Sequence, residues 1–137
     1  MQACYHPESE FNDSAFVGLN AKQVKAMWHM LNETGKELTL TYTGITANDK
    51  TGKAHWEAWY TFSKTGNKVH NIIDASFEFK DGLIISHKDS FDFYRWAGFA
   101  FGFTGKIIGW TPFFKNKVQK AAKENLERFI AKHPEYN

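Results

Sequence analysis

The order of apolar and polar residues predicts one short helix followed by four strands. Asn20 and Gln23 have the spacing of a capping box, and apolar residues then recur at helical spacing over residues 21–32. After this helix, apolar and polar residues alternate in four segments, which short turns containing Gly, Asn or Asp separate. The expected strands are residues 37–47, 53–63, 68–80 and 83–93. Their short connections predict an antiparallel meander that is strongly twisted and buried on one face.

The remainder of the chain is expected to be mostly helical. Residues 93–102 are aromatic and predict a short helical turn, and Thr111 before Pro112 indicates the start of a helix over residues 112–132. Between them, residues 103–110 are apolar and contain two glycines, and we interpret them as a flap over the sheet or a contact for another subunit. Helix, meander and helix predict a single α+β domain over residues 1–137, in which sheet and helices pack as layers.

The strand expected at residues 83–93 carries the most informative pattern. Side chains two residues apart on a strand point to the same face. One face therefore carries Leu83, Ile85, His87, Asp89 and Phe91. A histidine and an aspartate on an otherwise apolar face are candidates for chemistry in a pocket, or for a structural pair at the rim of the sheet. Asp92 lies on the opposite face, where we expect it to cap the next helical turn or to pair with Arg95.

Neighbouring strands place further polar groups on the same predicted face. Trp56 and Tyr60 share one face of their strand, and Tyr42 and Asn71 occupy the corresponding faces of the two adjacent strands. Each of these side chains can donate a hydrogen bond to a ligand. The alternative for the two tyrosines is a ring in the core with a hydroxyl that reaches water.

Composition and charge narrow the class of protein. Aromatic residues make up 17% of the chain, which indicates a large aromatic core, a ligand cavity or a subunit interface. A net charge of +2 is too small to indicate a nucleic-acid partner. The sequence has no bilayer-length apolar run and no signal-peptide pattern, and Cys4 is its only cysteine. We therefore expect a cytoplasmic protein with neither a membrane nor a nucleic-acid partner. We also expect no cofactor and no metal, since His87 and Asp89 lack an evident third ligand.

Several stretches of the sequence carry a family resemblance. They are Tyr5-His6-Pro7, Asp13-Ser14-Ala15-Phe16, Ala26-Met27-Trp28, Tyr60-Thr61-Phe62-Ser63-Lys64-Thr65-Gly66, the run from His87 to Trp96, and Gly109-Trp110-Thr111-Pro112-Phe113. With them, the chain resembles the SnoaL-like branch of the nuclear transport factor two-like, or ketosteroid isomerase-like, superfamily. The resemblance implies a cone-shaped, cystatin-like fold, in which a curved antiparallel sheet wraps around helices and leaves a deep apolar cavity. It also implies homodimers formed through the convex face of the sheet. The chain departs from the family at its start, where residues 1–5 resemble only the last turn of a longer N-terminal helix.

The resemblance also implies roles for the candidate residues. Related enzymes use a carboxylate inside the cone as an acid or base, with hydrogen-bond donors that stabilise an enolate. Asp89 matches the position of the base, His87 would orient it or share its proton, and Asp13 is a second carboxylate. A small apolar carbonyl compound would then undergo isomerisation, cyclisation or dehydration. Two alternatives stay open: a non-catalytic module that binds an apolar ligand, and a dimerisation module.

Overall fold

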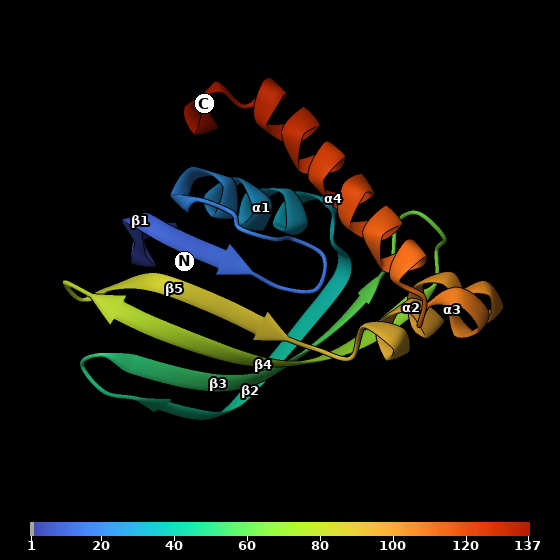
Figure 1. The fold of residues 1–137 in the computed structure, drawn as a ribbon, viewed down its shortest axis with the longest axis horizontal. Coiled ribbons are helices and arrows are strands. Elements are labelled where there is room, and N and C mark those ends of the chain that lie inside the picture. Colours follow the sequence, from blue (N-terminus) through green and yellow to red (C-terminus); the bar gives the residue numbers. More distant parts are fainter. Residues whose placement is uncertain (1) are drawn as a thin grey trace.

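A curved sheet with helices across its concave side forms the fold (Figure 1). The computed structural model describes residues 2–137. Its elements are η1 (Gln2–Cys4), β1 (Tyr5–Asn12), α1 (Ala21–Thr34), β2 (Lys36–Ala47), β3 (Thr51–Thr61), β4 (Lys68–Lys80), β5 (Leu83–Ser90), α2 (Phe93–Phe101), α3 (Phe103–Ile108), α4 (Pro112–Lys132) and η2 (Pro134–Tyr136). The bounds of β4 and α4 are those that the sequence predicts, and those of the other predicted elements differ by one to three residues.

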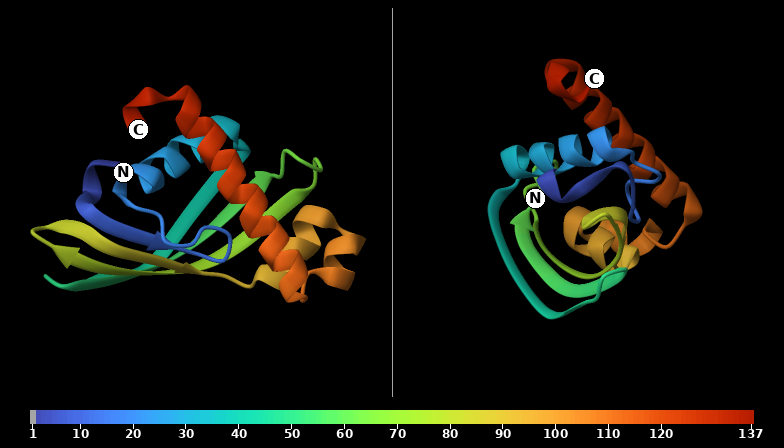
Figure 2. Two further views of the ribbon diagram at one scale, coloured as in Figure 1. Left: turned by 45° about the horizontal axis from the view of Figure 1, so that its top comes forward. Right: turned by 90° about the vertical axis from the view of Figure 1, so that its left-hand side faces the viewer.

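The five strands form one sheet in the order β1-β5-β4-β3-β2. Strands β2 to β5 make the expected antiparallel meander, and β1 pairs with β5 in parallel. The sheet curls around its concave side without closing, and α1 and α4 lie across the open side (Figure 2). The predicted α+β fold, a curved sheet wrapped around helices with a short first helical segment, is therefore confirmed.

Strand β1 is the element that the sequence pattern does not predict. The sequence predicts the last turn of a helix at residues 1–5. Met1 lies outside the described residues, residues 2–4 form the single turn η1, and the chain is extended from Tyr5. Pro7 is unusual inside a strand, since it cannot donate a backbone hydrogen bond. It is tolerated here because β1 is an edge strand whose register with β5 is irregular between Tyr5 and Glu10. Within β1, the side chains of Tyr5 and Phe11 point into the core.

Two apolar clusters hold the layers together. The first joins β1, α1 and α4, and it consists of Tyr5, Phe11, Phe16, Leu19, Val24, Ala26, Met27 and Leu126. The second joins β4, α2 and the start of α4, and it consists of Val69, Phe93, Trp96, Ala97, Ala100 and Phe114. Tyr5 belongs to the first cluster, and Tyr60 packs against the second, so the two clusters fix both ends of the site described below.

The apolar segment 103–110 does not form a flap over the sheet. It forms the short helix α3, which packs against α2 beside the second cluster. Gly105 lies so close to the backbone of Ala97 that a Cβ atom would collide with it, which explains a glycine at this contact. Phe103, Trp110 and Phe113 remain 71–77% exposed. The interpretation of this segment as a subunit contact stays a prediction. In the part of the chain that the structure describes, no helix combines the length and apolar character needed to span a membrane.

Candidate active site

His87 and Asp89 lie side by side on the concave face of β5. Both side chains are buried, with 3% and 8% of their residues' surfaces exposed, as the alternation of β5 predicts. Phe11 on β1 and Phe77 on β4 are the cross-strand neighbours of His87. Their rings lie 4.8 and 4.4 Å from the imidazole, centroid to centroid. The pair is therefore set in an apolar wall, where polar groups need partners within the protein.

A chain of hydrogen bonds supplies those partners. The indole Nε1–H of Trp28 donates to the hydroxyl of Tyr5 over 2.9 Å, and this hydroxyl lies 2.8 Å from Nδ1 of His87. Nε2 of His87 lies 2.8 Å from Oδ1 of Asp89. When Asp89 is a carboxylate it can only accept, so Nε2 carries the proton and Nδ1 accepts from Tyr5. Every link then runs in one direction, and a neutral imidazole satisfies the whole chain.

Burial keeps the hydroxyl of Tyr5 protonated. Desolvation raises the pKa of Tyr5 to about 12, and the negative charge of Asp89 adds to this shift, while the hydrogen bond from Trp28 opposes it. The hydroxyl of Tyr5 consequently keeps its proton at physiological pH and can donate it to Nδ1 of His87. Tyr5 at Nδ1 and Asp89 at Nε2 together fix the tautomer of the neutral imidazole.

Asp13 is a second carboxyl group in the same region, and it is partly buried. It directly follows β1, and its Oδ1 accepts hydrogen bonds from the backbone N–H groups of Ala15 and Phe16 at 2.7 and 2.6 Å. Burial raises the pKa of Asp13 to about 6, although these two hydrogen bonds lower it, and the negative charge of Asp89 raises it further. Asp13 therefore exchanges its proton close to neutral pH, which is what an acid–base group needs.

Tyr60 brings a hydroxyl close enough to Asp13 to feel its charge. The indole Nε1–H of Trp96 donates to the hydroxyl of Tyr60 over 2.8 Å. Burial raises the pKa of Tyr60, and the charge of Asp13 contributes to the rise. Because the hydroxyl already accepts from Trp96, its own hydrogen is free to point at an acceptor.

One oxygen of each carboxyl group is left without a protein partner. Oδ2 of Asp13 and Oδ2 of Asp89 make no hydrogen bond to any residue in 2–137. Within the same range, Ser9 Oγ is the only fully buried side-chain polar atom that lacks a partner. Both Oδ2 atoms are therefore open to solvent or to a small ligand.

The other predicted site residues are distributed along the sheet. The side chain of Trp56 is half-buried, with its ring 6.3 Å from that of Trp28. Asn71 is 8% exposed and lines a hollow of about 280 Å³ with Asp92 and Arg95. The side chain of Asp92 caps α2 by accepting from the backbone N–H of Arg95 at 3.0 Å, as predicted.

Tyr42 does not join the group. It is the cross-strand neighbour of Trp56, as the predicted pairing requires, but it is 71% exposed. The reason is that β2 forms an edge of the sheet, and neither apolar cluster extends to it within the described residues.

Three residues of the site have roles that the sequence does not reveal. Tyr5, Trp28 and Trp96 hold the catalytic candidates in place, and the contact between Tyr5 and His87 joins positions 82 residues apart. Periodicity describes only the faces of single elements, so it cannot predict such contacts. The one signal in the sequence is that Tyr5, Trp28 and Trp96 all fall within the stretches that carry the family resemblance.

Solved structures with the same fold include proteins of different kinds. A hypothetical protein with a ketosteroid isomerase-like fold from Catenulispora acidiphila, solved with trimethylamine, is 11% identical, with a TM-score of 0.63 over 81% of this chain and 84% of its own. TsrD from Streptomyces laurentii is 18% identical, with a TM-score of 0.62 over 73% of this chain and 79% of its own. An LEH-like epoxide hydrolase from M. tuberculosis is 15% identical, with a TM-score of 0.58 over 78% of this chain and 80% of its own.

At these identities, the three likenesses establish the fold alone. A search of the curated proteins finds no match to the chain. The family model for the SnoaL-like domain matches residues 1–87, which is more than half of the sequence and ends at His87. With this match and the curved sheet, the chain belongs to the SnoaL-like family of the nuclear transport factor two-like superfamily.

Proposed function

We propose that the chain binds a small apolar carbonyl compound on the concave face of the sheet and transfers a proton at the carbon next to the carbonyl. The reaction would be an isomerisation, a cyclisation or a dehydration. One observation carries the proposal: buried Asp89 and partly buried Asp13 each have a carboxyl oxygen without a protein partner, and the charge of Asp89 raises the pKa of Asp13. Paired carboxyl groups in such an environment are characteristic of acid–base sites.

Asp89 is the proposed base. His87 binds its Oδ1, so the free Oδ2 is held in one orientation and takes the proton from the substrate carbon. His87 acts as a positioning residue, because both of its ring nitrogens are already engaged. Tyr5 and Trp28 in turn hold His87, which pre-organises the base before a ligand arrives.

Tyr60 and Asp13 would act at the carbonyl oxygen. As the proton leaves carbon, negative charge develops on this oxygen, and a donor aimed at it lowers the barrier. The free hydrogen of the Tyr60 hydroxyl can supply this bond, and Asp13 in its acid form can supply a proton. Protonated Asp89 then returns its proton to another carbon of the substrate, and the enol oxygen returns to Asp13 any proton that it received. The isomerisation is then complete, and both carboxyl groups are restored.

The surroundings support an apolar ligand of small size. The rings of Phe11, Phe77 and Trp28 lie around His87, and the ring of Trp56 lies beside that of Trp28. Such walls favour apolar compounds and strengthen the few polar contacts within them. The epoxide hydrolase from M. tuberculosis demonstrates that this fold can hold an enzyme, although its chemistry is its own.

A non-catalytic binding module is the second candidate. It is favoured by the complete satisfaction of His87, because a structural pair needs no further partner.

We also propose that the chain forms homodimers through the convex face of the sheet, where Trp59 and Ile72 are each 37% exposed. Large apolar side chains on the outer face of a sheet are typical of an interface.

Proton exchange distinguishes the two candidates. A panel of small cyclic ketones is incubated with the protein in D₂O, and loss of the proton signal next to the carbonyl is followed by NMR. The proposal predicts exchange by the wild-type protein and a loss of at least about a hundredfold in Asp89→Asn. Asp49→Asn, a carboxyl change in the exposed turn between β2 and β3, should exchange like wild type. Exchange that survives Asp89→Asn contradicts the assignment of the base. Ligand binding without exchange by wild type, detected by tryptophan fluorescence, favours the binding module.

A further inference from the structure

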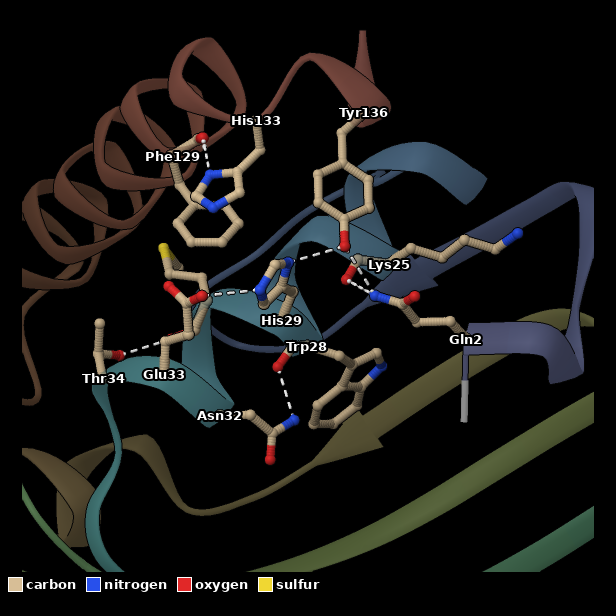
Figure 3. A network of polar contacts seen from close by, with 11 residues as sticks. Gln2, Lys25, Trp28, His29, Asn32, Glu33, Thr34, Phe129, His133 and Tyr136 are labelled. Carbon is tan, nitrogen blue, oxygen red and sulfur yellow. Dashed lines mark hydrogen bonds and ion pairs between the residues drawn. The ribbon is translucent and has the colours of Figure 1, made fainter.

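We propose that His29, Glu33 and His133 form a binding site for a divalent transition-metal ion such as Zn²⁺ (Figure 3). This cluster lies between α1 and the C-terminal end of α4. It shares no residue with the proposed proton-transfer site, so either proposal can fail without the other. The sequence-based expectation of no metal rests on the possible ligands near His87 alone, and this cluster lies elsewhere.

Two of the three ligands come from one face of α1. His29 and Glu33 are four residues apart on the helix, which places their side chains next to each other. Nε2 of His29 lies 2.8 Å from Oε1 of Glu33. A proton now bridges these two atoms, and a metal ion would take its place.

The third ligand arrives from the other end of the chain. His133 is the C-cap of α4, which crosses α1 so that the rings of His29 and His133 are 5.0 Å apart between centroids. One donor atom from each of the three residues lies within 4.8 Å of the other two. Bound to zinc, such atoms would lie ~3.3 Å apart, given Zn–N and Zn–O distances of ~2.0–2.2 Å. The widest separation, which is at most 4.8 Å, must therefore shrink by no more than ~1.5 Å, and Glu33, whose side chain is 53% exposed, has room to move.

Hydrogen bonds orient the imidazole rings of His29 and His133. In each ring, Nδ1 makes this bond, and Nδ1 is the nitrogen that would face away from the metal. Nδ1–H of His133 donates to the carbonyl oxygen of Phe129 over 2.8 Å, and the ring stacks on that of Phe129 at 3.9 Å. This leaves Nε2 of His133 with its lone pair and with no hydrogen-bond partner among residues 2–137. Nδ1 of His29 lies 2.9 Å from the hydroxyl of Tyr136, which Gln2 also binds. Figure 3 shows both rings turned so that their other nitrogens lie on the side of Glu33. Outer contacts of this kind are typical of metal-binding histidines.

The donor set indicates which ions would bind. Two imidazole nitrogens and one carboxylate oxygen suit Zn²⁺ and its neighbours in the transition series, whereas Mg²⁺ and Ca²⁺ require mostly oxygen ligands. Three protein ligands at a half-exposed position leave a fourth coordination site for water. Bound metal would join α1 to the C-terminal end of α4.

Calorimetry on the full chain tests the site. Protein freed of metal with a chelator is titrated with ZnCl₂, and with MgCl₂ for comparison. We expect one Zn²⁺ per chain and no measurable Mg²⁺ binding. Glu33→Gln, which keeps the hydrogen bond to His29, and His133→Gln should each weaken Zn²⁺ binding by at least about tenfold. The matched control is His55→Gln, because His55 contacts two carboxylates, Asp74 and Glu57, on the outer face of the sheet.

Each outcome of the titration decides the question. Weakening in Glu33→Gln with unchanged binding in His55→Gln supports the site, even if His133→Gln is found by circular dichroism to be misfolded. Wild-type Zn²⁺ binding that Glu33→Gln leaves intact, or that is lost in His55→Gln instead, overturns the proposal. An absence of saturable Zn²⁺ binding by the wild-type chain also overturns it, and the cluster is then a structural ion pair beside a stack of aromatic rings.

Discussion

Replacing Asp13 by asparagine should make the protein more stable at neutral pH and remove part of its pH dependence. The pKa of Asp13 rises from its ordinary value of 3.8 to about 6 in the folded chain, mainly because of burial. A pKa shift of about two units corresponds to about 3 kcal/mol. Relative to the unfolded chain, the folded state favours the protonated carboxyl group over the charged one by this amount. The side-chain amide introduced by Asp13→Asn is neutral at every pH, and its Oδ1 can still accept from the backbone N–H groups of Ala15 and Phe16.

The direction of the pH effect follows from which state holds the proton. The folded chain keeps the proton of Asp13 up to about pH 6, whereas the unfolded chain loses it near pH 3.8. The stability that this group contributes is therefore fully present below pH 3.8 and is lost as the pH rises through 6. Relative to wild type, Asp13→Asn should gain about 1–3 kcal/mol in free energy of unfolding between about pH 4 and pH 8, and the gain should level off above that range.

Urea unfolding followed by tryptophan fluorescence measures this difference. Both proteins are unfolded at a series of pH values, and the difference between their free energies of unfolding cancels the titration of all other groups. Asp49→Asn, in an exposed turn, should show no such difference. A stability difference between wild type and Asp13→Asn that does not change with pH would refute the reasoning. So would a variant that is less stable than wild type at about pH 8, since the buried charge would then be favourable.

Two further predictions concern the support of the site and the outer face of the sheet. Tyr5→Phe removes the hydroxyl between Trp28 and His87, and leaving these two groups unpaired should lower the free energy of unfolding by about 2–4 kcal/mol. Tyr94→Phe, which removes a half-exposed bond to a backbone carbonyl, should cost about 1 kcal/mol or less, and equal losses would contradict the hydrogen-bond chain. Ile72→Asp places a charge on the convex face and should convert the proposed dimer to a monomer in analytical ultracentrifugation. A wild-type monomer, or a dimer that persists in the variant, would exclude this interface.

Local patterns are sufficient to predict most of the fold. The meander follows from alternation and short turns, and the bounds of α4 follow from Thr111, Pro112 and one apolar stripe. Strand β1 is not predictable in the same way, because Pro7 disrupts its pattern and its partner β5 lies far away in the sequence. The packing of α3 against α2 depends on the contact of Gly105 with Ala97, which is tertiary.

Local patterns likewise predict one part of the candidate site and miss the part that depends on tertiary packing. Strand parity places His87 and Asp89 together, because both lie on β5. Asp92 lies beyond the end of β5, where it caps α2, one of the two roles that the sequence predicts for it. The Tyr5 contact to His87 and the approach of His133 to His29 depend on how whole elements pack, which parity does not describe. For Tyr42, the predicted pairing with Trp56 is correct. The pairing does not predict how exposed Tyr42 is, because that depends on what covers the edge of the sheet.

The most direct test of the proposed chemistry is a crystal structure of the protein with a ketone that undergoes exchange. We predict that the carbon next to the carbonyl lies within ~3.5 Å of Oδ2 of Asp89. We also predict that the carbonyl oxygen faces the hydroxyl of Tyr60, with His87 still bound to Oδ1 of Asp89. A ligand bound away from the concave face, or an Asp89 side chain that points away from the ligand, would contradict the proposed chemistry.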